Sequence, residues 1–248
     1  MRRAASVAAL FSLLLVAACG GGGERPELDV FAASSLEPVL SRWAPEIEER
    51  LGVELSLSFA SSTVVARQVV EGAPADVLIT ADRRSMQIAA DAGVVDDRRP
   101  VARNRLALVV RASNPVRIRS VRDLQRSDVK LVLCDPDVPC GRLAANLIER
   151  VGLSVRPVSF EENVSAAIGK VALGEADATI AYASDLRAGR ADIEGVAMPE
   201  ADDPELEAVY PAAVVRRTTH RAAAESLIEL LTSSRGRAVF GRAGFLAP

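Results

Sequence analysis

The sequence predicts an α/β protein. Short apolar runs of strand length alternate with segments whose apolar residues recur every three to four positions, as on one face of a helix. Strand-then-helix repetition of this kind is typical of parallel sheets with helices on both faces. The 248 residues are enough for one large domain or for two lobes of about 100–130 residues, each able to bury a core.

The first half of the chain supplies three strands, each followed by a helix. Strands are expected over residues 28–33, 53–59 and 76–80. The first helix follows Ser34 and Ser35, and Pro45 inside it predicts a kink or a restart. The apolar face of that helix comprises Leu36, Val39, Leu40, Trp43 and Ile47. The second helix begins near Ser62 and ends at about Glu71, and the third ends near Gly93.

The second half continues the same pattern. Strands are expected over residues 106–110, 130–134 and 176–181, and helices over about 141–151 and 163–173. No internal repeat is evident.

Residues 1–18 are expected to be a signal peptide. Arg2 and Arg3 precede an apolar stretch that is too short to span a bilayer comfortably but fits the h-region of an export signal. Two alanines then precede Cys19 and four glycines, an order that resembles a bacterial lipobox with Cys19 as the lipidated mature N-terminus. Ordinary cleavage beside an incidental cysteine is the alternative. Residues 19–26 would form the lipidated cysteine and a Gly-rich tether, which makes the protein a lipoprotein anchored outside the cytoplasm.

The composition argues against several classes of function. Aromatic residues are only 4% and the formal charge is −3, so neither base stacking nor phosphate-backbone binding is expected, and nucleic acid is not an expected partner. His220 is the only histidine, which excludes a metal site built on several histidines and restricts any Ser-His-Asp triad to that residue. Glycine-rich nucleotide motifs and nucleophile elbows are absent from the sequence. We therefore expect no enzymatic activity and no cofactor.

Paired serines follow two of the expected strands. The stretches FAASS at 31–35 and FASS at 59–62 each end a strand with a small residue and then open a helix with two serines. Ligands of open α/β sheets collect beyond the carboxyl ends of strands, where helix N-termini present unpaired N–H groups. Serine hydroxyls add directed donors, so these junctions are candidates for binding an oxyanion. The alternative is that all four serines are only N-caps.

Two junctions in the second half resemble these serine pairs, and a tyrosine ends a further strand. Cys140 lies at the start of the helix after the strand that ends at Cys134, and Val164 begins another helix, so the backbone amides of both are candidate donors. Tyr182 ends an apolar strand and can present its hydroxyl to a site, or it can pack in the core with a wet tip.

Cys134 and Cys140 form a possible disulfide. The loop between them contains Pro136 and Pro139 and must return to the same sheet edge, and the expected compartment is oxidising. The alternative is two free thiols, because closing so short a loop gains little chain entropy.

Along nearly the whole mature chain, from about Leu28 to Phe245, the sequence resembles the periplasmic molybdate-binding proteins of bacterial ABC importers. The matching stretches, in order, are FAASSL at 31–36, FASST at 59–63, GAPADV at 72–77, the strand end at Thr80 with Ala81 and Asp82, GEAD at 174–177, YASD at 182–185, and Tyr210-Pro211. The departure is Cys140, where members of the family usually carry a small residue such as alanine.

The resemblance implies a non-enzymatic, solute-binding protein of two lobes that close like a hinge on molybdate or tungstate and deliver it to an ABC transporter permease. Lobe 1 would comprise residues 27–104 and 211–248, and lobe 2 residues 105–210, each a mainly parallel sheet flanked by helices. The protein would be a monomer that holds the oxyanion through protein donors, with no side chain bonded directly to the metal. Carried over by position, the ligand residues are Ser35, Ser62, Cys140, Val164 and Tyr182.

Three other functions remain open on the sequence. The same fold can be adapted to sulfate, phosphate or another small oxyanion. A hydrolase would use Ser35 or Ser62 as its nucleophile, although no Ser-His pairing is visible. An effector-sensing domain of a regulator would require a DNA-binding segment, whereas the N-terminus resembles an export signal.

Overall fold

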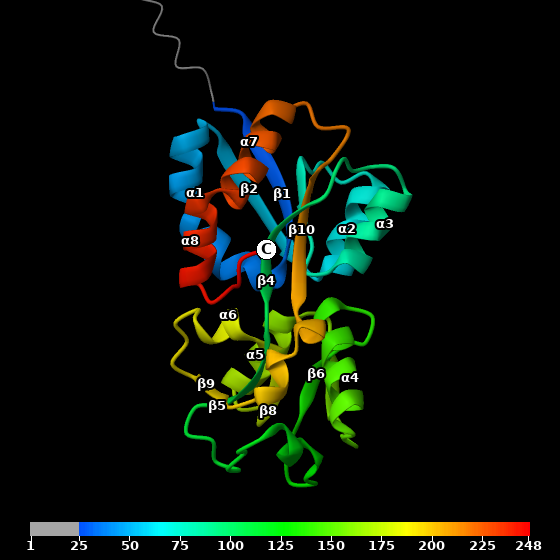
Figure 1. Cartoon of the computed structure of the whole chain (residues 1–248), viewed down its shortest axis with the longest axis vertical. Helices are drawn as coiled ribbons and strands as arrows, with labels where there is room; N and C mark the ends of the chain where they lie inside the picture. The colour runs from blue at the N-terminus through cyan, green and yellow to red at the C-terminus, as the bar shows by residue number, and fades with distance from the viewer. Residues whose placement is uncertain (1–24) are drawn as a thin grey trace, which may run out of the picture.

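The computed structural model describes residues 25–248, and their elements form two groups joined by extended strands (Figure 1). The expected signal peptide over residues 1–18, the lipidation site Cys19 and most of the tether lie outside the described residues. None of the helices within residues 25–248 combines the length and the apolar character needed to cross a membrane.

The first group is built on a five-stranded sheet with the order β2-β1-β3-β10-β4. These strands are β1 (Glu27–Ala33), β2 (Glu54–Ala60), β3 (Val77–Ile79), β4 (Arg99–Asn104) and β10 (Ala208–Val214). Its helices are η1 (Ser34–Leu36), α1 (Glu37–Leu51), α2 (Ser62–Glu71), α3 (Arg83–Asp91), α7 (Arg221–Thr232) and α8 (Ser234–Arg242). The apolar sides of α2 and α3 pack on one part of the sheet, while α1, α7 and α8 pack on another.

The second group contains a three-stranded sheet and a two-stranded sheet. Its strands are β5 (Leu106–Arg111), β6 (Val132–Cys134), β7 (Ser159–Glu161), β8 (Ala178–Tyr182) and β9 (Ile193–Val196). A parallel bridge between Leu131 and Ala178 joins the two sheets. The helices of the second group are α4 (Pro139–Val151), α5 (Val164–Ala172) and α6 (Ala183–Leu186), with the 3-10 turns η2 (Val121–Gln125), η3 (Pro199–Asp202) and η4 (Pro204–Leu206).

The α/β class is confirmed, and the sheets are mixed rather than mainly parallel. Strand β1 runs parallel to β2 and β3, but β10 runs antiparallel to β3 and β4, and β5 runs antiparallel to β8 and β9. The reason for the antiparallel β10 is connectivity. The chain leaves the first group through β4, enters the second group through β5, and returns through β10, which therefore runs opposite to β4.

The chain crosses between the groups at two places. It passes from β4 into β5 between Asn104 and Leu106, and it is back in the first sheet at the start of β10, Ala208. The division into lobes of 27–104 with 211–248 and of 105–210, as units that move relative to one another, stays a prediction.

Helix α1 continues through Pro45, so a restart of the helix at that residue is wrong. A proline in a helix interior removes one backbone hydrogen bond. Four apolar side chains on the same face, those of Val39, Leu40, Trp43 and Ile47, are buried against the sheet. Their burial offsets the missing bond.

Candidate functional site

A small cavity lies between the two groups of elements, and all five expected ligand residues line it: Ser35, Ser62, Cys140, Val164 and Tyr182. The remaining lining residues are Ala33, Ser34, Ser61, Ala81, Val138, Pro139 and Asn163. Its volume is about 20 Å³. Because a cavity of about 10–15 Å³ holds one water molecule, this space suits a compact ion in the arrangement that the structure describes.

Helix starts from both groups meet at the cavity. Helices α2 and η1 begin there from the first group, and α4 and α5 begin there from the second. The first N–H groups of a helix have no acceptor within the helix, and its N-terminus carries about half a positive charge. The backbone N–H groups at these helix starts, including those of Cys140 and Val164, are therefore candidate donors to a ligand in the cavity.

At the second serine pair, the structure assigns different contacts to the two hydroxyls. Ser61 is the N-cap of α2, and its oxygen accepts a hydrogen bond from the backbone N–H of Val64. The Ser62 oxygen accepts instead from the backbone N–H of Ala81 at 2.8 Å. This bond fixes the Ser62 oxygen and leaves its hydroxyl hydrogen to donate into the cavity.

At the first serine pair, neither side chain caps a helix, since the N-cap of η1 is Ala33 and no side-chain cap bond forms there. The Ser35 hydroxyl lies 2.9 Å from the hydroxyl of Tyr210. The side-chain amide of Asn104 donates to the Tyr210 oxygen at 3.4 Å and to Ser184 at 2.8 Å. Either hydroxyl of this pair can be the donor. When Tyr210 donates to Ser35, the Ser35 hydrogen is available to a ligand.

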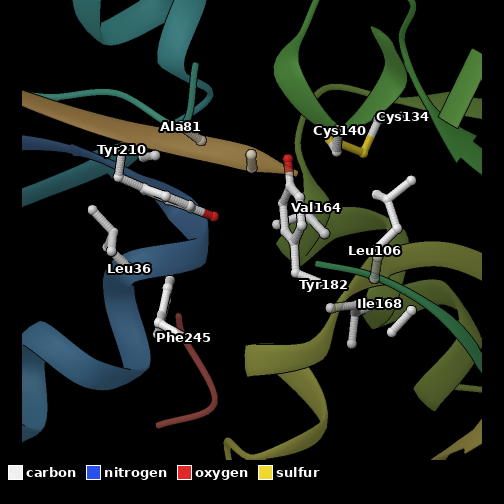
Figure 2. Packing of buried hydrophobic residues seen from close by; sticks show 14 of the residues in the cluster. Leu36, Ala81, Leu106, Cys134, Cys140, Val164, Ile168, Tyr182, Tyr210 and Phe245 are labelled. Atoms are coloured by element: carbon white, nitrogen blue, oxygen red, sulfur yellow. A yellow bond between two sulfur atoms is a disulfide. The ribbon is translucent and has the colours of Figure 1, made fainter. Parts of the chain in front are cut away.

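Tyr182 presents a phenol without a protein partner. Its side chain is 1% exposed, and within residues 25–248 no group accepts from or donates to its hydroxyl. Figure 2 shows the hydroxyls of Tyr182 and Tyr210 pointing into the space between the two groups. The two rings lie edge to face, with 6.5 Å between their centroids. Burial raises the pKa of Tyr182 well above its ordinary value, so the phenol stays protonated and can only donate to an anion.

Asp185 lies behind Tyr182 and is buried. Its carboxylate accepts a hydrogen bond from the backbone N–H of Tyr182 at 2.9 Å at the start of α6. Burial raises the pKa of Asp185 to about 7, although that hydrogen bond and the charge of Arg190 act in the opposite direction. Burial therefore favours the protonated form of a carboxyl that contacts the backbone of Tyr182.

The loop that presents the Cys140 amide is closed by a disulfide between Cys134 and Cys140, with a Cα–Cα distance of 5.8 Å (Figure 2). Gly141 follows directly, and a Cβ at this position would lie 1.9 Å from the carbonyl oxygen of Asp135. Only glycine lets the start of α4 approach the loop this closely.

No Asp, Glu, Lys or Arg is among the described residues that line the cavity. Hydroxyls and backbone amides therefore supply the polar groups, together with the Asn163 side chain, which already accepts a hydrogen bond from the backbone N–H of Ala166 as the N-cap of α5. The arrangement can replace the hydration shell of an anion with neutral donors from several directions.

Asn104, Ser184, Asp185 and the amide of Ala81 were not expected to be part of the site, and Tyr210 was expected only as part of the Tyr210-Pro211 motif. The signal for Tyr210 was its place in the Tyr210-Pro211 motif. In the structure the register of β10 with β4 shifts at this pair, because proline has no N–H to donate to the ladder.

Comparison with known proteins identifies the family of the chain. Residues 28–246 match the family model of the bacterial extracellular solute-binding proteins. The chain is 34% identical over 221 residues to the molybdate-binding protein ModA of Mycobacterium tuberculosis, covering 88% of this chain and 84% of that protein. It is 26% identical over 255 residues to a putative ABC transporter substrate-binding lipoprotein of Bacillus subtilis, covering 97% and 96%.

A solved structure has the same architecture. The periplasmic molybdate-binding protein of Azotobacter vinelandii superposes with a TM-score of 0.75, covering 89% of this chain and 99% of that one at 21% identity.

Proposed function

Because the chain belongs to the bacterial extracellular solute-binding protein family, and is thus a binding protein and not an enzyme, we propose that it captures molybdate or tungstate and delivers it to an ABC permease. The observation that carries this proposal is the meeting of all five expected donors at one cavity of ionic size without charged side chains. The relative in M. tuberculosis that bears the name molybdate-binding protein supports the choice of ligand.

The donor set favours a fully deprotonated dianion. Molybdate and tungstate carry no proton at neutral pH, so each oxygen can accept from hydroxyls and amides. Monobasic phosphate would bring an O–H into a cavity whose described lining has no carboxylate to accept it. An unpaired buried donor costs about 1–3 kcal/mol. Sulfate needs no acceptor, but its smaller shell leaves part of the donor set out of reach.

Binding is proposed to close the two lobes. The donors come from both groups of elements, with Ser35 and Ser62 on the first and Cys140, Val164 and Tyr182 on the second. An anion that contacts both groups binds the closed arrangement better than an open one, and this difference in affinity drives closure. The crossings near Arg105 and Tyr210 would act as the hinge.

The proposed location is the outer face of the cell membrane, with a lipid on Cys19 as the anchor and the Gly-rich segment as the tether. The order of the residues at 15–23 and the relative in B. subtilis that is named a lipoprotein support this location.

Isothermal titration calorimetry of the purified mature protein against molybdate, tungstate, sulfate and phosphate tests the proposed ligand. Molybdate and tungstate should bind about 5- to 150-fold more tightly than phosphate, which corresponds to the cost of one unpaired donor. The alternative candidate is another small oxyanion on the same donor set. Equal or tighter binding of sulfate or phosphate would favour that alternative and refute the proposed selectivity.

A further inference from the structure

Beside the ligand cavity, a set of polar contacts joins the two groups of elements. Nε of Arg142 donates to Oδ2 of Asp82 at 3.0 Å, and Nη2 of Arg142 donates to the same oxygen. Nη2 also lies 3.2 Å from the hydroxyl of Ser85. The hydroxyl of Thr63 donates to the carbonyl oxygen of Asp137 at 3.0 Å, and Nη1 of Arg142 donates to that carbonyl too.

Both partners of the ion pair are held in place by their own group. Oδ1 of Asp82 accepts from the backbone N–H of Ser85 at 2.7 Å and caps α3, so only Oδ2 faces the other group. Arg142 lies in the first turn of α4. The side chains of Arg142 and Asp82 are 18% and 19% exposed. Partial burial and fixed partners make this pair stronger than ordinary surface pairs, which contribute little.

Each partner is adjacent to a group that presents a donor to the ligand. Asp82 follows Ala81, whose N–H fixes the Ser62 oxygen. Arg142 lies two residues after Cys140 on the same helix. Separation of the two groups would therefore break the ion pair and withdraw these ligand donors from each other in the same movement.

We propose that Arg142 and Asp82 form a latch that holds the two lobes closed and thereby sets how fast the bound oxyanion dissociates. Neither residue lines the cavity, so both are positioning residues rather than ligand contacts. The latch exists only when the lobes meet, and a contact made in only one of two states shifts the equilibrium toward that state. This inference rests on the proposed function.

Three single variants separate the latch from general stability. Arg142→Met removes the guanidinium and keeps an unbranched apolar stem. Asp82→Asn removes the charge and keeps an oxygen able to cap α3. Arg150→Met is the matched control on the same helix, because Arg150 pairs with Asp203 and Glu205 inside the second group only.

The measurement is the dissociation rate of radiolabelled molybdate into excess unlabelled molybdate, together with the association rate. Arg142→Met and Asp82→Asn should each raise the dissociation rate at least about tenfold, because each variant removes or weakens the two charge-assisted bonds between Arg142 and Asp82. The association rate should change little. The double variant should be no worse than the more affected single variant, because the two residues act as one pair. Arg150→Met should match the wild type, and Arg142→Lys should recover part of the loss.

An unchanged dissociation rate in Arg142→Met, in a wild-type background that binds molybdate, overturns the latch and leaves the proposed function intact. If the wild type binds no molybdate, the proposed function fails, and small-angle X-ray scattering of the protein without oxyanion decides the latch separately. A larger radius of gyration for Arg142→Met than for Arg150→Met then supports the latch, and equal radii overturn it.

Discussion

The three hydroxyls of Ser35, Ser62 and Tyr182 line the cavity and can donate to a ligand. The Ser62 oxygen accepts from the backbone N–H of Ala81, and the Ser35 hydroxyl shares a hydrogen bond with the hydroxyl of Tyr210. The hydroxyl of Tyr182 makes no bond to any residue that the structure describes. Groups oriented in this way lose little freedom when an anion binds, so more of the interaction energy appears as affinity.

Removing one hydroxyl should weaken binding without unfolding the protein. Tyr182→Phe deletes one bond to a buried anion, worth about 1.5–3 kcal/mol, and so should lower the affinity for molybdate about 10- to 150-fold. Ser35→Ala and Ser62→Ala should cost similar amounts. Calorimetry measures the affinity, and Ser233→Ala, which removes the N-cap of α8 away from the cavity, is the control for stability alone. Unaltered affinity in all three site variants would show that the ligand assignment is wrong.

Asp185 should make the stability of the protein depend on pH. Its pKa is raised by burial to about 7 from an ordinary value near 3.8, so folding favours its protonated form. The stability that this group contributes is fully present below about pH 4 and is lost as the pH rises toward 7. Asp185→Asn keeps an acceptor for the Tyr182 N–H and does not titrate.

Urea denaturation of both proteins from pH 4 to pH 8 measures the effect. The stability of Asp185→Asn relative to the wild type should increase by a few kcal/mol between pH 4 and pH 7, at about 1.4 kcal/mol for each unit of pKa difference. Above about pH 7 this difference in stability should stay constant. A relative stability that is independent of pH would mean that Asp185 titrates normally in the folded protein.

At the scale of the elements, local sequence patterns predicted the two serine junctions of the site, whereas the contacts that join them to β4 and β10 are long-range. The strand, small residue and paired serines at 31–35 and 59–62 are short-range signals, and both lie at the cavity. The contact of Ser35 with Tyr210 spans 175 positions, and that of Asn104 with Tyr210 spans 106. No local periodicity encodes such contacts. For the same reason the strands β4 and β10, which pair with each other in the first sheet and lead into the two crossings, were not expected from the alternation of apolar residues.

The disulfide between Cys134 and Cys140 should order the loop that presents the Cys140 amide to the ligand. Thiol counting on denatured, unreduced mature protein should find neither thiol free. Reduction should weaken molybdate binding severalfold, because binding would then have to order the loop, at a cost of about 0.5–1.5 kcal/mol for each side chain immobilised. The double variant Cys134→Ser, Cys140→Ser controls for effects of the reductant itself. Two free thiols would rule out the bridge, and an affinity insensitive to reductant would limit its role to stability.

At the scale of the whole molecule, the proposed lipid anchor keeps the two lobes beside the membrane while the tether leaves them free to reach a permease. Cys19→Ala removes the acylated residue and should release the protein from the membrane fraction or block its processing. Partitioning of cell extracts between detergent and aqueous phases measures this change. Cys134→Ser keeps the signal intact and should stay in the detergent phase. A Cys19→Ala protein that still partitions with detergent would contradict the lipobox interpretation.

The central claim is that one oxyanion lies between the two groups of elements, held by neutral donors from both. Crystals of the mature protein grown with molybdate, with diffraction recorded for the anomalous signal of molybdenum, test this claim most directly. A single anomalous peak should lie in the cavity, with its oxygens within hydrogen-bonding distance of the hydroxyls of Ser35, Ser62 and Tyr182 and the amides of Cys140 and Val164. A peak at another position, or a molybdate contacted by only one of the two groups, would contradict the account.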